Sequence, residues 1–346
     1  MRLKSYRPLR NWGSRFTGLD TPSTWSEWPV AEPGYHRRVM LRRLLLAVAP
    51  LLAIVNLAAA EPRLVLLGTA GGPTPKRTRS APAQALQLGD AIYVIDCGNG
   101  VARQMVLAGL PLRDLRHVFV THHHSDHVAD LITLPLLAWA SGLDHPVTLH
   151  GPRPLKRSVK AGLAANAFDI ATREKDEGRP PLRSLVRVDE FRGDGIVYRD
   201  SLVTVRAARV DHPPIDEAYG YRFDTVHWSV VISGDTAPSD NLVRLARGAD
   251  VLVHEVLLAG ADEVSAWVGK PLDDPLVRHI LRSHTSFRDV GQIARDAGVK
   301  KLVLSHYVPG DASVDREAVL SEIRKSFDGE VVFGEDLLVI EPAGGE

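Results

Sequence analysis

The sequence of 346 residues contains a single cysteine, Cys97. One cysteine excludes an internal disulfide and a zinc cluster built from several thiolates. We therefore expect Cys97 to be a small buried side chain at the end of a strand. The sequence also lacks internal repeats, low-complexity tracts and long runs of like charge. With 45% hydrophobic and 24% charged residues, the composition is that of an ordinary globular protein.

A surplus of basic residues is missing as well. The chain has 42 Lys and Arg residues against 42 Asp and Glu residues. Residues 1–60 hold nine of the basic and three of the acidic residues, which leaves 33 basic and 39 acidic residues in the rest of the chain. Proteins that bind a nucleic acid duplex or tRNA usually carry a basic surplus. The composition therefore predicts that nucleic acid is not a partner.

No apolar run is long enough to be a clear membrane span. The run Leu44–Ala60 has 17 residues, fewer than the roughly 20 that cross a bilayer, and a proline and an asparagine interrupt it. It follows Arg42 and Arg43 and ends in three alanines, which is the layout of a secretory signal peptide. We expect residues 40–60 to be cleaved after Ala60, leaving an exported, periplasmic or secreted protein without stable membrane association. Retention as a membrane anchor is the alternative.

Residues 1–39 fit neither role, because they are rich in Arg, Pro, Ser and Trp and have no helical or strand period. We expect translation to start at Met40 and residues 1–39 to be a non-native or disordered extension. A rival interpretation takes Arg37–Leu41 as part of a loose twin-arginine export signal. In either case we expect residues 61–346 to form one domain.

Short apolar runs alternate with helical patterns along this domain. Because the runs are rich in Val, Leu and Ile, they predict strands buried on both faces. Residues 185–232 are expected to form successive antiparallel strands, and residues 74–82 and 256–276 to be loops. The pattern predicts an αββα sandwich, in which two mixed β-sheets are flanked by helices. The predicted strands are 64–67, 91–95, 118–120, 230–232, 251–253 and 302–304, and the predicted helices lie near 128–140, 152–165, 239–247, 286–297 and 315–327.

Polar side chains with metal-binding chemistry follow four of these apolar runs. His122 comes just after the third run, Asp235 after the fourth, His254 and Glu255 after the fifth, and His306 after the sixth. Ligands in open α/β sheets gather at the carboxyl ends of the strands. Four such coincidences predict one common site.

The motif H-x-H-x-D-H at 122–127 supplies the types of ligand that zinc takes when thiolates are absent. Two histidines two residues apart in a tight loop can bind one ion, which assigns His122 and His124 to a first metal. Asp126 and His127 are then directed to a second metal, and Asp235 suits a bridge because each of its oxygens can bind one ion. Two metals about 3.5–4 Å apart form a clamp for hydrolysis. The alternative, a surface loop rich in histidine, does not explain the buried strand that precedes the motif.

With these motifs the sequence resembles the metallo-β-lactamase superfamily, and within it the branch of ribonuclease Z and the zinc-dependent arylsulfatases. The resemblance covers nearly all of residues 63–341. It rests on motifs of several residues that occur in the order typical of the family. These are Gly68–Pro73, Asp96–Gly100, Thr121–His127, Gly151-Pro152, Asp211-His212, Tyr219–Phe223, Ser233–Thr236, His254-Glu255, His284–Ser286 and Ser305-His306.

The resemblance implies two zinc ions, although a His and Asp ligand set would also accept Mn²⁺ or Fe²⁺. It assigns His122, His124 and His212 to the first ion, Asp126, His127 and His306 to the second, and Asp235 to both. It also implies that His284 protonates the leaving group or binds the oxyanion, and that Glu255 orients His284. Among the remaining histidines, we expect His150, His227 and His254 to be structural and assign no role to His117, His145 or His279. Trp139 and Trp267 are expected to serve in packing rather than in the cleft.

The fold does not fix the substrate. In bacterial ribonuclease Z a long arm that grips tRNA follows the Gly-Tyr-Arg strand, whereas here only Asp224–Ile232 follow it before Ser233. Residues 167–174 and 195–198 are more similar to the arylsulfatase-type group. We therefore predict a metal-bridging hydroxide that attacks a small anionic substrate, either a sulfate ester or a phosphate diester. The alternatives are a β-lactam or lactone hydrolase, a tRNA 3′-processing endoribonuclease and a zinc-stabilised binding module, and none of these observations excludes a homodimer.

Overall fold

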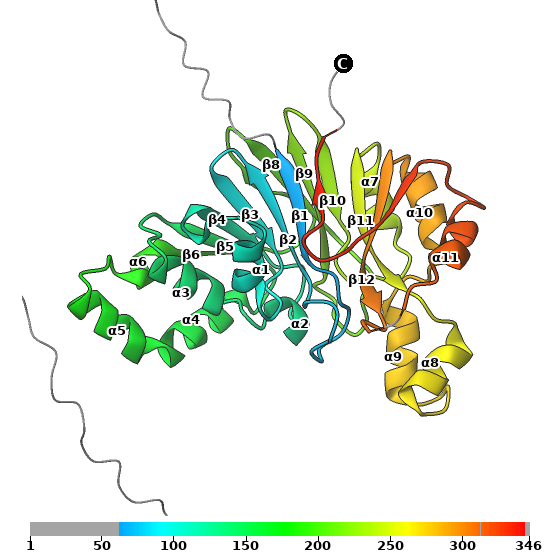
Figure 1. Ribbon diagram of the computed structural model, residues 1–346, viewed down its shortest axis with the longest axis horizontal. Coiled ribbons are helices and arrows are strands. Elements are labelled where there is room, and N and C mark those ends of the chain that lie inside the picture. Colours follow the sequence, from blue (N-terminus) through cyan, green and yellow to red (C-terminus); the bar gives the residue numbers. More distant parts are fainter. Residues whose placement is uncertain (1–61, 312, 343–346) are drawn as a thin grey trace, which may run out of the picture. The chain divides into compact units, whose positions relative to one another are not determined.

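Two β-sheets lie face to face and helices cover their outer faces in the computed structural model, which describes residues 62–311 and 313–342 (Figure 1). The predictions for residues 1–60, including the extension and the signal peptide, lie outside the described residues. Within them, no helix combines the length and apolar character needed to cross a membrane. The predicted αββα sandwich is confirmed.

The first sheet has seven strands among the described residues, in the order β14-β1-β2-β3-β4-β5-β6. Strands β3 to β6 pair in parallel, whereas β14, β1, β2 and β3 pair antiparallel. Side chains alternate between its faces, as the pleat of a strand requires: Leu64 and Leu66 point to the inner core, and Val65 and Leu67 to the outer one. The strands are β1 Arg63–Gly68, β2 Ala83–Leu88, β3 Ala91–Ile95, β4 Leu115–Phe119, β5 Val147–Gly151, β6 Val186–Glu190 and β14 Val339–Ile340.

The second sheet also has seven described strands, in the order β13-β12-β11-β10-β9-β8-β7. Strands β10 to β13 are parallel, and β7 to β10 pair antiparallel. Val230 and Ile232 lie in the core between the sheets. Val231, which stands between them in the sequence, packs under the outer helices. The strands are β7 Gly195–Arg199, β8 Val203–Arg209, β9 Tyr219–Thr225, β10 Ser229–Ile232, β11 Val251–Leu257, β12 Lys301–Val308 and β13 Glu330–Phe333.

Helices α1 to α6 pack on the first sheet, and α7, α10 and α11 on the second, while α8 and α9 project beside the lower end of β12 (Figure 1). Trp139 is fully buried in the core under the first group, as expected for a packing residue, and the free thiol of Cys97 is buried in the same core. The helices are α1 Val101–Leu107, α2 Ser125–Val128, α3 Thr133–Ala140, α4 Leu155–Ala165, α5 Ala167–Asp176, α6 Leu182–Leu185, α7 Asp240–Ala246, α8 Ala261–Val268, α9 Pro275–Ser283, α10 Val290–Ala297 and α11 Arg316–Ile323, with a short 3₁₀ turn at Leu112–Asp114.

Three expectations about secondary structure are wrong. The segment 256–276 is not a loop, because it holds the end of β11, all of α8 and the start of α9. The helix expected over 128–140 is split into α2 and α3 by a turn. Strand β6 pairs in parallel with β5 in the first sheet and is not part of the antiparallel series, which begins at β7. Helix α8 is short and its polar first turn resembles loop composition, so its residues show only a weak periodic pattern.

Candidate metal centre

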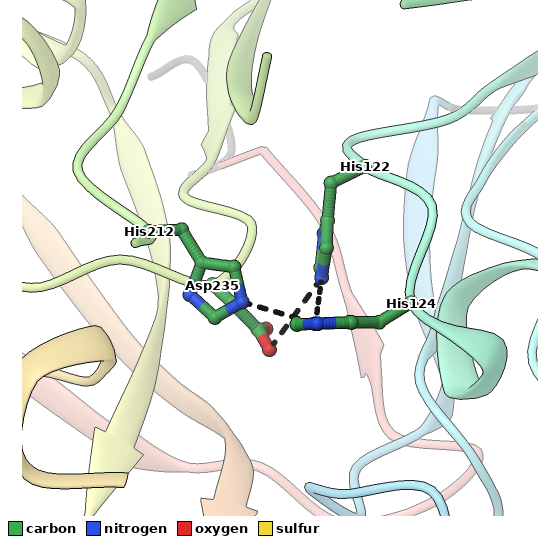
Figure 2. Close-up of side chains that lie close together, drawn as sticks. All are labelled: His122, His124, His212 and Asp235. Carbon is green, nitrogen blue, oxygen red and sulfur yellow. Dashed lines mark hydrogen bonds and ion pairs between the residues drawn. The ribbon is translucent and has the colours of Figure 1, made fainter. Parts of the chain in front are cut away.

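The H-x-H-x-D-H motif lies where β4 leaves the first sheet and α2 begins. Its side chains face residues that follow strands of the second sheet, so that the site is built from both halves of the sandwich. In Figure 2, His122 and His124 come from the β4–α2 loop, and their rings lie close to the ring of His212 and the carboxylate of Asp235. The four side chains bring one ligand atom each within 4.8 Å of one another.

The nitrogen atoms of the first cluster lie very close together. His124 Nδ1 is 3.0 Å from His122 Nε2 and 3.1 Å from His212 Nε2. Asp235 Oδ2 lies 3.9 Å from His122 Nε2. His122, His212 and Asp235 are buried, and His124 is partly exposed. Three imidazoles and one carboxylate that converge from separate elements form a ligand set suited to a divalent metal.

Hydrogen bonds on the far side of the rings fix which nitrogen faces the cluster. His212 Nδ1 donates to the Ser283 carbonyl at 2.9 Å, so the neutral ring presents an unprotonated Nε2 to the cluster. The Thr121 hydroxyl donates its one proton to Asp96, so it accepts from His122 Nδ1 at 3.0 Å. This leaves His122 Nε2 unprotonated as well, as metal coordination requires.

The second cluster consists of Asp126, His127, Asp235 and His306, all buried. Asp235 Oδ1 lies 3.3 Å from His127 Nε2 and 3.1 Å from His306 Nε2. Asp126 Oδ2 lies 3.7 and 3.6 Å from the same two nitrogens. Asp235 therefore belongs to both clusters and presents a different oxygen to each, as a bridging carboxylate would.

The polar atoms of the second cluster are not satisfied by the chain itself. His127 Nε2, Asp235 Oδ1 and His306 Nε2 are buried without a hydrogen-bond partner. Leaving such atoms unpaired costs about 1–3 kcal/mol each. They border a cavity of about 20 Å³, which is room for about one water or ion. Buried polar atoms that point at one another around a space of this size fit a bound divalent metal.

The protonation states of the histidines fit the same interpretation. Burial lowers the pKa of His122 well below its usual value and lowers the pKa of His212 to about 4, so both rings are neutral. Burial acts in the same direction on His127, but Asp235, Asp96 and Asp126 outweigh it and raise the pKa of His127. Three carboxylates around one imidazole attract positive charge to this centre. A bound metal ion would supply that charge in place of the proton on His127.

Asp96 holds the loop from the side opposite the clusters. Its carboxylate accepts from the backbone N–H of Thr121 at 2.8 Å, from the Thr121 hydroxyl, and from His127 Nδ1 at 2.7 Å. The bond to Nδ1 turns His127 Nε2 toward the second cluster. Asp96 has a left-handed backbone, with φ 61°, which aims its side chain back under the motif.

His284 lies between the two clusters, with its ring centroid 5.5 Å from that of His212 and 5.8 Å from that of His306. Its Nδ1 lies 3.3 Å from Glu255 Oε1, and the backbone N–H of Thr285 donates to the same oxygen at 2.8 Å. Burial lowers the pKa of His284, but the Glu255 carboxylate outweighs burial and raises that pKa to about 9. A protonated imidazole beside a metal site can give a proton to a departing oxygen.

His279, to which the sequence assigned no role, belongs to this neighbourhood. Its ring centroid lies 5.9 Å from that of His124, 6.0 Å from that of His212 and 6.5 Å from that of His284. Ser283 Oγ donates to the Pro213 carbonyl and lies 3.2 Å from His279 Nδ1. The i, i+4 spacing of His279 and Ser283 could have shown that they share one face of a helix.

The remaining histidines lie outside the two clusters. His123 Nε2 donates to the Pro152 carbonyl at 2.9 Å. His150 is buried and contacts Asp189 and His117, at 3.2 and 3.0 Å. His254 Nδ1 donates to the Glu255 carbonyl. His150 and His254 therefore have structural partners, although the pairing of His150 with His117 was not expected.

One cavity is lined in part by a residue of the first cluster, and a second is lined by other residues. One, of about 430 Å³, is lined by His212, Arg209 and Arg282 among others. The second, of about 450 Å³, is lined among others by Leu258, Trp267 and Pro309. Leu258 follows β11, Trp267 lies in the last turn of α8, and Pro309 follows β12. Trp267 is 49% exposed at this second cavity and not buried in a core.

Known proteins resemble this chain in sequence over most of its length. A family model described as a β-lactamase superfamily domain matches residues 92–307. A protein named Ribonuclease Z from Mycobacterium bovis (strain BCG / Pasteur 1173P2) is 33% identical over 284 residues, which are 80% of this chain and 97% of that protein. A Ribonuclease Z from Mycobacterium avium (strain 104) is 34% identical over 280 residues, 79% of this chain and 96% of that protein.

Solved structures show the same fold at lower identity. The metallo-β-lactamase fold protein YhfI from Bacillus subtilis has a TM-score of 0.60 and 21% identity, and the match covers 81% of this chain and 99% of that one. The short form of human tRNase Z has a TM-score of 0.59 and 20% identity, with the same coverage. The names Ribonuclease Z and tRNase Z conflict with the expectation from composition that nucleic acid is not a partner.

Three findings point to the same family. They are the sandwich fold, the two His and Asp clusters that share Asp235, and the match of the family model over residues 92–307. The chain belongs to the metallo-β-lactamase superfamily and is a metal-dependent hydrolase of ester bonds, with curated relatives named Ribonuclease Z.

Proposed function

We propose that this chain is a phosphodiesterase that cleaves the 3′ trailer from precursor tRNA, the reaction for which its ribonuclease Z relatives are named. The observation that carries the proposal is the pair of buried clusters that share Asp235, with His284 beside both. Sequence identity of 33% over 97% of the length of a ribonuclease Z supports a phosphodiester substrate over a sulfate ester. The proposal replaces the small ester that the sequence favoured.

The two clusters would hold two divalent ions, which when bound neutralise a phosphate group and lower the pKa of an attacking water. Zinc suits the ligand set, and manganese or iron would also be accepted. His122, His124 and His212 would hold one ion, Asp126, His127 and His306 the other, and Asp235 would bind both.

The chain's own groups would then handle the proton of the leaving oxygen. The Glu255 carboxylate lies 3.3 Å from Nδ1 of His284, so Nε2 of that ring would be the atom that donates toward the departing oxygen of the phosphodiester. Glu255 is itself held by the backbone N–H groups of Thr285 and Thr236. Because both N–H groups hold Oε1 of Glu255, this oxygen keeps its place beside Nδ1 of His284 and orients the ring.

A small sulfate ester or phosphate diester is the second candidate, and one observation favours it. Only residues 226–228 join β9 to β10, so the arm that grips tRNA in bacterial ribonuclease Z is absent from this connection. A non-catalytic binding module disagrees with the family match, and no contact in the site favours a β-lactam or a lactone.

Export through residues 40–60 stays a prediction. It conflicts with the proposal of tRNA cleavage, because precursor tRNA is made inside the cell. Fractionation of cells that express the full chain tests the two together. Chain in the cytoplasmic fraction, with residues 40–60 uncleaved, would favour precursor tRNA. Chain only in the exported fraction would favour the small ester.

A panel assay tests the proposed reaction. Metal-loaded full-length chain is offered a precursor tRNA, bis(p-nitrophenyl) phosphate, an aryl sulfate and a chromogenic cephalosporin, each beside the Asp235→Ala variant. We expect turnover of the precursor tRNA and the phosphate diester, and none in the variant. Turnover of the aryl sulfate alone would overturn the proposal in favour of the second candidate.

A further inference from the structure

A stripe of positive charge runs along the exposed side of helix α4. Lys156, Arg157 and Lys160 are all exposed, and their spacing of i, i+1 and i+4 places them on one side of the helix. Arg153, also exposed, lies just before the helix begins. Leu155, at the start of the opposite face, is buried with Val159 and Leu163 in the core under the first sheet. The stripe is therefore held in place by a helix whose other face is packed.

The stripe has few anionic neighbours. Arg153 lies 3.4 Å from Glu190, whose other oxygen accepts the backbone N–H of Lys156. Within residues 62–311 and 313–342, no carboxylate lies within 4.0 Å of the cationic groups of Lys156, Arg157 or Lys160. Residues 61–346 carry six more acidic than basic residues, so cations without acidic partners are gathered here against the overall balance.

The stripe begins beside the metal centre. His123, between two proposed metal ligands, donates to the carbonyl of Pro152, the residue before Arg153. Gly151 ends β5 and Leu155 starts α4, and the helix runs from there toward α5 (Figure 1). The stripe therefore starts one residue after a backbone carbonyl that the metal-binding loop contacts.

The dimensions of the stripe suit a nucleic acid strand. Lys156 and Lys160 are four residues apart in the helix, a rise of about 6 Å, while phosphates in one strand follow each other at about 3.4 Å along a duplex axis. Phe168, 87% exposed at the start of α5 just after α4 ends, offers an aromatic surface on which a base can stack. Cations followed by an exposed aromatic ring favour a nucleic acid over other polyanions.

We propose that the exposed face of α4, formed by Lys156, Arg157 and Lys160, together with Arg153 just before the helix, binds the phosphate backbone of the RNA substrate next to the metal centre. The inference rests on the proposed function. It also accounts for how a chain without an arm between β9 and β10 can hold a long RNA.

The test compares two triple variants of the full-length metal-loaded chain. The first is Lys156→Ala, Arg157→Ala and Lys160→Ala. The matched control is Arg295→Ala, Lys300→Ala and Lys325→Ala, which removes three exposed cations in and beside α10 and α11. For each, kcat/KM is measured from 50 to 200 mM KCl with a precursor tRNA and with bis(p-nitrophenyl) phosphate.

We expect the α4 variant to lose at least about tenfold in kcat/KM for the precursor tRNA at 150 mM KCl. The slope of log(kcat/KM) against log[KCl] should become shallower by about 2–3, because each phosphate contact contributes about 0.7–0.9. Turnover of the small diester should stay within twofold of wild type, which also shows that the variant is folded. The charge-preserving variant Lys156→Arg, Arg157→Lys and Lys160→Arg should cleave RNA like wild type.

Three results would overturn the inference. If the α4 variant cleaves precursor tRNA with wild-type kcat/KM and salt slope, the surface is wrong and the proposed function stands. If the control loses as much as the α4 variant, the effect is one of net charge and not of this face. If wild type hydrolyses the small diester but never precursor tRNA, the proposed function fails, and the RNA surface fails with it.

Discussion

Asp235 is the residue on which both clusters depend, since its two oxygens face different sets of nitrogens. Its carboxylate is buried, but its interactions with the imidazoles of His306 and His127 outweigh burial and lower its pKa. An anion held in this way suits a place between two cations. No other carboxylate in the described residues belongs to both four-residue groups.

Asp235→Ala should therefore remove the link between the two ions. We expect the metal content to fall from two ions per chain to at most one, and kcat/KM for bis(p-nitrophenyl) phosphate to fall at least about 10²-fold. Metal analysis of the purified variant and initial rates measure both quantities. Asp240→Ala, at an exposed position at the start of α7, is the control. Two tightly bound ions in the Asp235 variant would refute the bridging role.

His284 should matter more when the leaving group is poor. We expect His284→Ala to lower kcat for precursor tRNA by about 10²–10⁴-fold while both metals stay bound. The loss for bis(p-nitrophenyl) phosphate should be much smaller, because p-nitrophenolate departs without a proton. Glu255→Gln should show the same pattern in weaker form. An equal loss on both substrates would mean that His284 binds the phosphate and does not act as an acid.

At the level of elements, the site depends on where strands end and where their backbones deviate. His306 has φ 43° and sits at an irregularity between β11 and β12, where Glu255 pairs with Ser305 and Val256 with Tyr307. This extra residue turns the His306 side chain out of the strand's regular alternation and toward the second cluster. The sequence predicted that β12 leads to a ligand, but it contained nothing that specifies the bulge.

The turn between β3 and α1 lies directly against the metal-binding loop, so a side chain added at Gly98 would collide with that loop. A Cβ on Gly98 would lie 2.7 Å from the Asp126 carbonyl oxygen and 2.7 Å from the Pro82 carbonyl oxygen. Gly98→Ala should push the loop away, lowering the free energy of unfolding by about 1–3 kcal/mol and weakening metal binding. Denaturant unfolding and metal titration check this. Gly260→Ala, with no contact under 3.4 Å, is the control, and an unchanged Gly98→Ala would contradict the account.

Sequence reasoning found the elements and residues whose evidence is local. The H-x-H-x-D-H motif and the apolar strands that end in polar residues needed only neighbours in sequence. His279 was missed because its closeness to His124 arises only when α9 folds back over the site. Helix α8 was missed for a related reason, because it is stabilised by packing of Val264 against residues of β11 and α9 and not by a strong pattern of its own. Helix α9 was missed although its apolar residues Val277 and Ile280 fall on one face.

At the scale of the whole molecule, the metals should contribute to stability, because the buried carboxylates and imidazoles lack partners without them. A ligand present at 100 times its Kd stabilises a protein by about 2.7 kcal/mol. For a domain of this size, that shifts Tm by roughly 5–10 °C. We expect EDTA to lower Tm by about this amount and added zinc to restore it. Thermal unfolding monitored by circular dichroism measures both changes. An unchanged Tm in the apo chain would contradict the presence of buried metals.

The fold and the chemistry of the site could be predicted from the sequence, whereas the substrate could not. Net charge argued against nucleic acid, but net charge sums over the whole surface and does not show that Lys156, Arg157 and Lys160 share one face next to the site. The position of those cations depends on the packing of α4 against the first sheet. A composition argument therefore does not test the local surface that we propose to bind RNA.

The most direct test of the central claim is the mapping of product ends after zinc-loaded full-length chain is incubated with a precursor tRNA. The account predicts one cut that releases the 3′ trailer, and no cut by the Asp235→Ala variant. An intact precursor tRNA, under conditions in which the same enzyme hydrolyses an aryl sulfate or bis(p-nitrophenyl) phosphate, would contradict it.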